Sequence, residues 1–163
     1  MQEPKLKLPT DSKIKKHLDL NPYSSDSILI SVESNKNNEY PSYIETPVML
    51  IGEKFKKIMS KYQPGIAFKM ALLLEREREH QEVYYAMTVP RVDCLIDNVP
   101  RDPHGFVKEL ILDEAKIGNH RIFRVKGYKE QLVVRLDVAE SLLRRGASGI
   151  SFNKIKTSGG TIK

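Results

Sequence analysis

The segment around the single cysteine holds the side chains that could support catalysis. Cys94 lies between Asp93 and Asp97, and His104 and His120 follow along the chain. A cysteine nucleophile needs a nearby base that lowers the pKa of its thiol, and this spacing places none beside Cys94. Its apolar neighbours are instead typical of a cysteine that packs as a small hydrophobic residue. A small hydrolytic enzyme that uses Cys94 therefore stays only as an alternative.

The same side chains do not have the spacing of a metal site. Asp93, Asp97 and His104 match no known ligand pattern, and no two histidines lie four residues apart as in a helical zinc site. The sequence has no glycine-rich phosphate loop and no nucleophile elbow. One cysteine excludes an internal disulfide and a multi-cysteine metal site. We expect a protein that is not an enzyme and that binds no metal and no cofactor.

Basic residues are concentrated toward the C-terminus. Residues 121–163 contain ten Lys and Arg against three Asp and Glu, whereas the first 120 residues contain 17 against 18. Such a region attracts an acidic partner, which can be a protein surface, a nucleic-acid backbone or a lipid headgroup. The candidate partner-binding residues are Arg121, Arg124, Lys126, Lys129, Arg144 and Arg145.

Nucleic-acid binding is the alternative that these basic residues leave open. Phe123 and Tyr128 alternate with them, and single-strand binding proteins combine stacked aromatic side chains with positive charge. Phe123, however, lies in the apolar stretch 122–125, where alternation should turn Phe123 inward and Arg124 and Lys126 outward. Aromatic residues are only 7% of the chain. We therefore favour a protein partner over nucleic acid.

Length and composition indicate a soluble globular protein. The chain has 163 residues, of which 40% are hydrophobic and 29% charged. The longest apolar run, residues 70–74, is too short to span a membrane, and the N-terminus lacks a signal peptide. We expect a cytoplasmic protein with a polar N-terminal arm (1–25), a single domain (26–156) and a flexible tail (157–163). Oligomeric state and stoichiometry stay open.

Hydrophobic periodicity predicts an α+β fold. Residues 66–74 and 83–89 should form a hairpin whose charged connection is solvated. Asp137 is the expected N-cap of the second helix, and Gly146 its C-cap. Strands are expected over 27–33, 48–51, 66–74, 83–89, 107–112, 121–126, 132–134 and 149–155, and helices over 53–62 and 137–145.

An internal repeat organises these elements. At an offset of 84 residues, Gly65 aligns with Gly149 and Phe68 with Phe152, without a gap from residue 48 to residue 69. The shared unit is a short strand, a helix, a small-residue turn and a Gly-Ile-x-Phe strand. We expect two strand–helix–strand units in one mixed sheet, with both helices packed on the sheet and both phenylalanines facing inward.

Several stretches resemble a family of bacterial immunity-like proteins associated with polymorphic toxins, immunity protein eleven. The stretches are Pro47–Ile51, Pro64–Phe68, the tyrosine-rich Tyr84–Asp97, Ile122–Val125 and Gly146–Phe152, within residues 40–156. Ile96 stands between Leu95 and Asp97, where the family motif has Leu-Asp. The resemblance implies a small α+β cytoplasmic domain that binds and neutralises a cognate toxin, and it supplies no catalytic residues.

Overall fold

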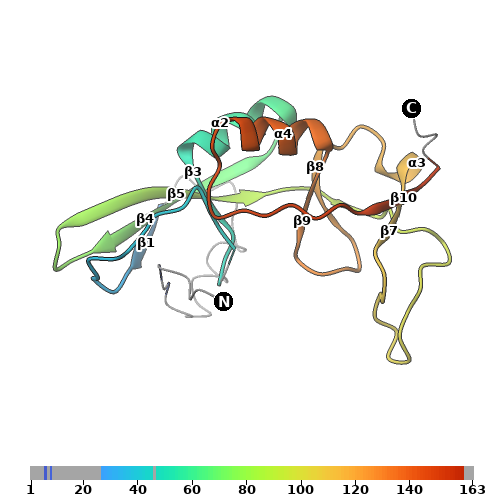
Figure 1. The fold of residues 1–163 in the computed structure, drawn as a ribbon, viewed down its shortest axis with the longest axis horizontal. Coiled ribbons are helices and arrows are strands. Elements are labelled where there is room, and N and C mark those ends of the chain that lie inside the picture. Colours follow the sequence, from blue (N-terminus) through green and yellow to red (C-terminus); the bar gives the residue numbers. More distant parts are fainter. Residues whose placement is uncertain (1–5, 7, 9–26, 46, 160–163) are drawn as a thin grey trace. The chain divides into compact units, whose positions relative to one another are not determined.

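The computed structural model describes residues 6, 8, 27–45 and 47–159 (Figure 1). Nearly all of the N-terminal arm expected over residues 1–25 lies outside the described residues. The chain forms two compact units, Met1–Thr88 with Ser141–Ile150 and Val89–Glu140 with Ser151–Lys163. Both units combine strands with helical residues, and the fold class is α+β, as predicted. The strands lie in three sheets rather than in the single mixed sheet that we expected.

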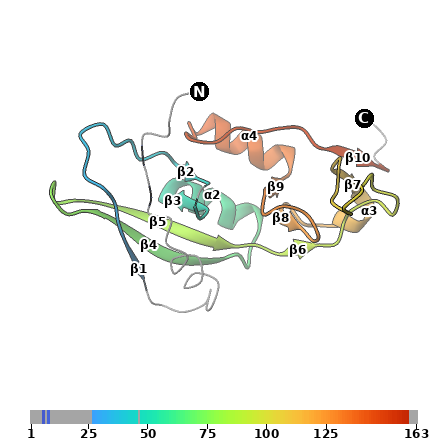
Figure 2. The same ribbon diagram turned by 90° about the horizontal axis from the view of Figure 1, so that it is seen from below.

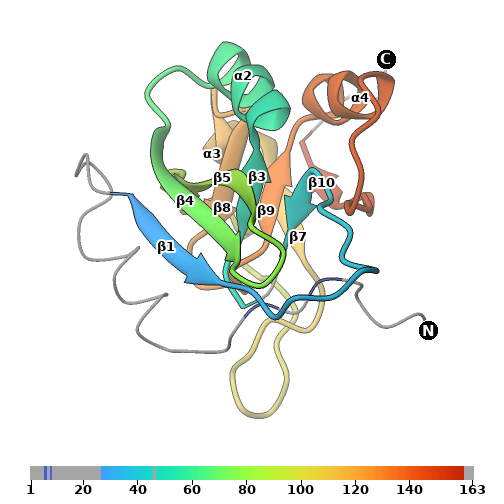
Figure 3. The ribbon, with the colours of Figure 1, turned by 90° about the vertical axis from the view of Figure 1, so that its left-hand side faces the viewer.

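The first unit is built on a five-stranded sheet with the strand order β1-β4-β5-β3-β2. β1 runs parallel to β4, and the other neighbours are antiparallel. Figure 3 shows β1, β4 and β5 side by side. The elements are β1 (Ile28–Ser31), β2 (Tyr43–Ile44), β3 (Leu50–Gly52), α2 (Glu53–Tyr62), β4 (Ala67–Glu75) and β5 (His80–Thr88).

The long hairpin β4–β5 confirms the predicted pairing of these two strands. Its inward side chains alternate along β4, so that Ala71 and Leu73 join Ile30 and Tyr84 in a buried cluster. Leu6 and Leu8, from the arm that we expected to be polar, pack half-buried against this cluster. The core of the first unit is therefore centred on β1, β4 and β5.

Helix α2 lies against β3 and β5 (Figure 2). Its buried side chains are Phe55, Ile58 and Met59, which is the apolar stripe of an amphipathic helix. At the edge of this contact, the Lys56 ammonium nitrogen lies 3.9 Å from the centre of the Tyr85 ring. Beyond the helix the same sheet carries an apolar strip in which Leu29, Met70 and Val83 are exposed.

The second unit contains a three-stranded sheet, β6-β8-β9, and a two-stranded parallel sheet, β7 with β10. The elements are β6 (Arg91–Val92), β7 (Ile111–Asp113), α3 (Glu114–Ile117), β8 (Ile122–Val125), β9 (Leu132–Val134) and β10 (Lys156–Ser158). The strand expected over 107–112 is thus shorter and later. In β8, Ile122 is buried as well as Phe123 and Val125, so the predicted polar face of this strand reduces to Arg124.

Helix α4 (Leu136–Arg144) confirms the second predicted helix and begins one residue earlier than expected. Asp137 therefore lies in the first turn and is not the N-cap. Its carboxylate lies 3.6 Å from the Arg121 guanidinium and 3.7 Å from that of Arg135. Gly146 follows the helix with φ +69°, as expected for a glycine that ends a helix.

The strand expected over Gly149–Ile155 does not form. Gly149 has φ +76°, a left-handed conformation that interrupts an extended chain. Next to it, Ser148 is bound to the first unit's own residues 42 and 43, since its carbonyl accepts from Tyr43 N at 3.2 Å and its hydroxyl from Ser42 N at 3.0 Å. The second copy of the sequence repeat thus keeps its first strand, its helix and its left-handed glycine, but it lacks the final strand. Phe152 lies half-buried outside any strand.

The last strand occurs later, at Lys156–Ser158, in the part that we expected to be a flexible tail from residue 157. Thr157 Oγ1 donates to Glu114 Oε1 at 2.6 Å, and Lys156 forms an ion pair with Glu109. These contacts hold β10 on β7. For Thr157 and Ser158 the prediction of a flexible tail is therefore wrong, and residues 160–163 lie outside the described residues.

Candidate partner-binding site

Cys94 lies in the core of the second unit and is fully buried. Burial, and after it the nearby Asp93 carboxylate, raises the pKa of its thiol. The two acidic neighbours face other partners, because Asp97 pairs with Lys116 at 2.6 Å and Asp93 with Lys126 at 3.5 Å. The structure therefore does not assemble a nucleophile with a base here. In the part of the chain that the structure describes, no cluster of three His, Cys, Asp or Glu could hold a metal ion.

We expect Cys94→Ser to lower the free energy of unfolding by about 1–3 kcal/mol, because a hydroxyl replaces a thiol at an apolar site. The native protein should react slowly with iodoacetamide near neutral pH, and denaturant should make the reaction fast. Unfolding in urea measures the first effect, and mass spectrometry of the alkylated chain measures the second. Rapid labelling of the native protein would contradict a buried, protonated Cys94.

The six basic residues predicted to bind a partner are divided between the two units. Arg121, Arg124, Lys126 and Lys129 belong to the second unit, and Arg144 and Arg145 to the first. Arg145 Nη1 donates to the Ser141 carbonyl at 3.2 Å and also contacts the Ser141 hydroxyl. Lys129 is exposed between β8 and β9, and Arg144 is exposed in the last turn of α4.

Of the four predicted partner-binding residues that belong to the second unit, three already face carboxylates of that unit. Arg121 pairs with Asp137 at 3.6 Å, Lys126 with Asp93 at 3.5 Å and Arg124 with Glu130 at 2.7 Å. Glu130 also forms an ion pair at 2.7 Å with Arg91, a residue outside the basic region of the sequence. The second unit as a whole contains 12 Lys and Arg against nine Asp and Glu. It thus keeps a positive excess, but these three candidate residues are paired within their own unit.

A projecting hairpin that precedes β7 is a better candidate for partner binding. It is the loop that extends below the unit in Figures 1 and 3, and Arg101 and Val107 pair across it in an antiparallel bridge. At its tip, Asp102 N donates to Phe106 O at 2.8 Å, and Gly105 N donates to Asp102 O at 2.9 Å. Gly105 has φ +86°, which this tight turn requires. The tip therefore has a fixed backbone conformation.

Two side chains and a further backbone hydrogen bond reinforce the tip. Asp102 Oδ1 accepts hydrogen bonds from the backbone nitrogens of His104 and Phe106, both at 2.9 Å. Arg101 Nη1 donates to the Gly105 carbonyl at 2.8 Å. Lys108 N donates to the Pro100 carbonyl at 2.8 Å. The backbone on either side of Phe106 is thus held by hydrogen bonds.

The Phe106 side chain is exposed to solvent. Its exposed fraction is 70%, whereas most large apolar side chains of the unit are half-buried or, like Phe123 at 1%, buried. Sequence reasoning missed this ring. Phe106 directly precedes Val107, and an aromatic next to a β-branched residue suggests the start of a buried strand.

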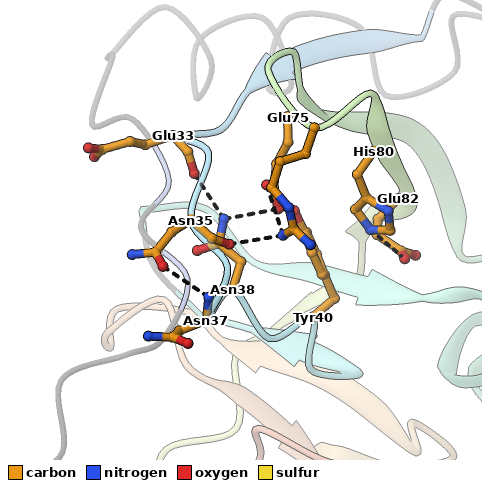
Figure 4. Close-up of polar contacts among 9 residues, drawn as sticks. Glu33, Asn35, Asn37, Asn38, Tyr40, Glu75, His80 and Glu82 are labelled. Atoms are coloured by element: carbon orange, nitrogen blue, oxygen red, sulfur yellow. Dashed lines mark hydrogen bonds and ion pairs between the residues drawn. The ribbon is translucent and has the colours of Figure 1, made fainter.

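A polar cluster lies in the first unit, at the turn end of the β4–β5 hairpin, where Glu75 pairs with His80 (Figure 4). Glu75 is 1% exposed, and its Oε1 accepts a hydrogen bond from Asn38 Nδ2 at 2.9 Å and another from the Tyr40 hydroxyl. Its Oε2 accepts from Arg78 Nη1 at 3.3 Å. Arg78 Nη1 also donates to the Asn35 carbonyl at 2.9 Å. The cluster fastens the loop between β1 and β2 to the hairpin.

The chemistry of this cluster is that of a structural clamp. The hydrogen bond from Tyr40, followed by that from Asn38, lowers the pKa of Glu75 below its ordinary value of 4.5. Burial and the neighbouring Glu75 raise the pKa of Tyr40. Glu75 thus stays ionised, is shielded from solvent and is hydrogen-bonded to its neighbours. These properties fit a structural role better than that of a general base.

Comparisons of the chain with family models, with curated proteins and with solved structures give no match in any of the three. No helix within the described ranges is both long and apolar enough to cross a membrane. The candidate site therefore rests on the geometry of the chain itself.

Proposed function

We propose that this chain is a non-enzymatic binding protein of the bacterial cytoplasm, an immunity protein that binds and neutralises a cognate toxin. The toxin assignment rests on the resemblance of the motifs within residues 40–156 to immunity protein eleven. The observation that supports protein binding is the exposed Phe106 ring at the tip of a hydrogen-bonded hairpin. The alternatives draw less support, because Cys94 is buried and the basic residues of the second unit largely face its own carboxylates.

Rigidity and projection give Phe106 its significance. Single exposed apolar side chains are common on protein surfaces, and exposure alone does not indicate a binding site. Aromatic side chains that enter a partner's pocket, however, carry a large share of the binding energy at protein interfaces. A tip whose backbone is already fixed loses little conformational entropy on binding. The hairpin therefore has the properties of a preformed anchor.

We expect Phe106→Ala to weaken binding of the partner on the order of 30-fold or more, because a buried aromatic anchor is lost. The tagged full-length chain would be recovered from the cell that naturally makes it, and its co-purifying protein identified and purified. Calorimetry would then compare the wild type with Phe106→Ala. The matched control is Leu136→Ala, which removes a similarly exposed apolar side chain from the second unit, and it should bind like the wild type.

Neutralisation needs its own measurement. The co-purifying protein, expressed alone in a naive bacterial host, should stop growth, and co-expression of the chain should restore it. Phe106→Ala should restore growth less well than Leu136→Ala. A co-purifying protein that is harmless would exclude the toxin assignment. Oligonucleotide binding that is submicromolar and selective at about 0.15 M salt, where electrostatic attraction is screened beyond about 8 Å, would favour nucleic-acid binding instead.

A further inference from the structure

The charges around Phe106 indicate what kind of pocket it fits. Arg101, His104 and Lys108 are exposed on the same hairpin. Its acidic side chains are already engaged, because Asp97 pairs with Lys116 and Glu109 with Lys156. The third, Asp102, accepts two backbone N–H groups of the tip. The tip therefore presents an aromatic ring among positive charges whose own acidic neighbours are occupied.

We propose that the hairpin tip inserts Phe106 into an apolar pocket on a protein partner, and that carboxylates at the rim of this pocket contact Arg101. This inference rests on the proposed function in that the partner is a protein, and it adds the chemistry of the surface that the partner presents.

Arg101 is the cation best placed to bind carboxylates at the rim of such a pocket. Its Nη1 is fixed on the Gly105 carbonyl at 2.8 Å, directly beside the residue that carries the ring. A guanidinium carries five N–H donors in one plane and can meet a carboxylate with two parallel hydrogen bonds. Lys108, an exposed residue two positions after the ring, adds positive potential. Arg101 thereby sets the orientation in which Phe106 can enter.

A protein pocket fits this tip better than a membrane or a nucleic acid. One ring with two cations gives only marginal attachment to a lipid surface, where each Lys or Arg adds about 1 kcal/mol. Nucleic-acid binding needs a row of cations along the phosphate backbone and several stacking side chains. Here the cations of β8 and its neighbourhood, Arg121, Arg124 and Lys126, face carboxylates of their own unit.

The test replaces Phe106 with the photo-crosslinking residue p-benzoylphenylalanine in the full-length chain, expressed in the cell that naturally makes it. The ring is exposed, so a larger aromatic fits without disturbing the core. The same residue at Leu136, which is 74% exposed, reports non-specific contacts. After irradiation, mass spectrometry identifies what is joined to position 106 and, for a protein, the peptide at which it is attached.

We expect a protein adduct at position 106 that is absent at position 136, with apolar and acidic residues around the attachment point. Arg101→Glu should lower the yield of this adduct roughly tenfold, because a like charge would face the rim. Lys154→Glu makes the same change of charge on an exposed lysine of the second unit and should alter the yield less than about twofold.

Each other result has a defined consequence. A protein adduct that is insensitive to Arg101→Glu would overturn the acidic rim but leave protein binding in place. A lipid or nucleic-acid adduct, or no adduct above that at position 136, would overturn the inference as a whole. The crosslinked protein could also lose its adduct with Arg101→Glu and yet be harmless to a bacterial host. That result would exclude the toxin assignment and leave the inference of an apolar pocket with an acidic rim in place.

Discussion

Gly149→Ala should lower the free energy of unfolding by about 2–5 kcal/mol, as measured by urea denaturation. Two effects add. A left-handed backbone conformation costs a residue with a side chain roughly 1–2 kcal/mol, and Gly149 has φ +76°. A Cβ atom at this position would also lie 2.5 Å from the Tyr43 carbonyl oxygen and 2.6 Å from Pro41 Cβ. Relieving such overlap within a packed structure typically costs another 1–3 kcal/mol.

The chain contains its own control for this prediction. Gly65, which aligns with Gly149 at the 84-residue offset, has φ +92°, but a Cβ atom there would have no other atom within 4 Å. Gly65→Ala should therefore cost only the conformational part, about 1–2 kcal/mol. The difference between the two variants measures the close approach to residues 41–43. Equal losses in the two variants would show that this approach does not contribute.

The same pair of glycines shows which parts of the fold a local sequence pattern can predict. The pattern of a short strand, a helix and a glycine turn is local, and both copies of it form. The path of the chain after the glycine depends on distant partners, because Ser148 binds Ser42 from 106 residues along the chain. After Gly65 the chain instead forms β4, which pairs with β5 along its whole length. Two similar stretches of sequence thus end differently because only the first is followed by residues that pair along their length with a neighbouring strand.

The candidate site shows a second feature that the sequence alone does not predict, which is how charged and apolar side chains are paired or exposed in space. Charge along the sequence drew attention to Arg121, Arg124 and Lys126, but a linear count cannot reveal that Asp137, Glu130 and Asp93 neutralise them in space. Phe106 escaped notice because apolar residues are expected inside. Its outward position follows from hydrogen bonds between the two sides of a turn, which periodicity does not encode.

Glu75 was also missed, although the sequence held a signal. It opens a run of charged residues, 75–82, which is typical of a solvated loop. The inward alternation of β4, however, passes from Ala71 and Leu73 to Glu75, and this places its carboxylate on the core side. The groups that satisfy it, Asn38 and Tyr40, lie 37 and 35 residues earlier. Alternation could predict its burial, but not its partners.

We expect Tyr40→Phe to destabilise the protein by about 1.5–3 kcal/mol near neutral pH, because a hydrogen bond to a buried ionised group is lost. Urea denaturation of both proteins measures this effect. Tyr128→Phe removes a hydroxyl from a half-buried tyrosine of the other unit and should change the stability by no more than about 0.5 kcal/mol. Glu75→Ala should cost more than Tyr40→Phe, since Asn38, Tyr40 and Arg78 would all lose their acceptor.

The pH dependence of the free energy of unfolding shows whether Glu75 is ionised or neutral in the folded protein. The pKa of Glu75 is lower in the folded chain than its ordinary value of 4.5. The stability that it contributes is therefore fully present above pH 4.5 and is lost as the pH falls from there through the lowered folded pKa. In Tyr40→Phe the strongest cause of the lowering is gone, so the pKa of Glu75 returns toward 4.5 and the acid loss becomes shallower. Parallel pH profiles for the wild type and Tyr40→Phe would mean that Tyr40 does not hold Glu75 ionised.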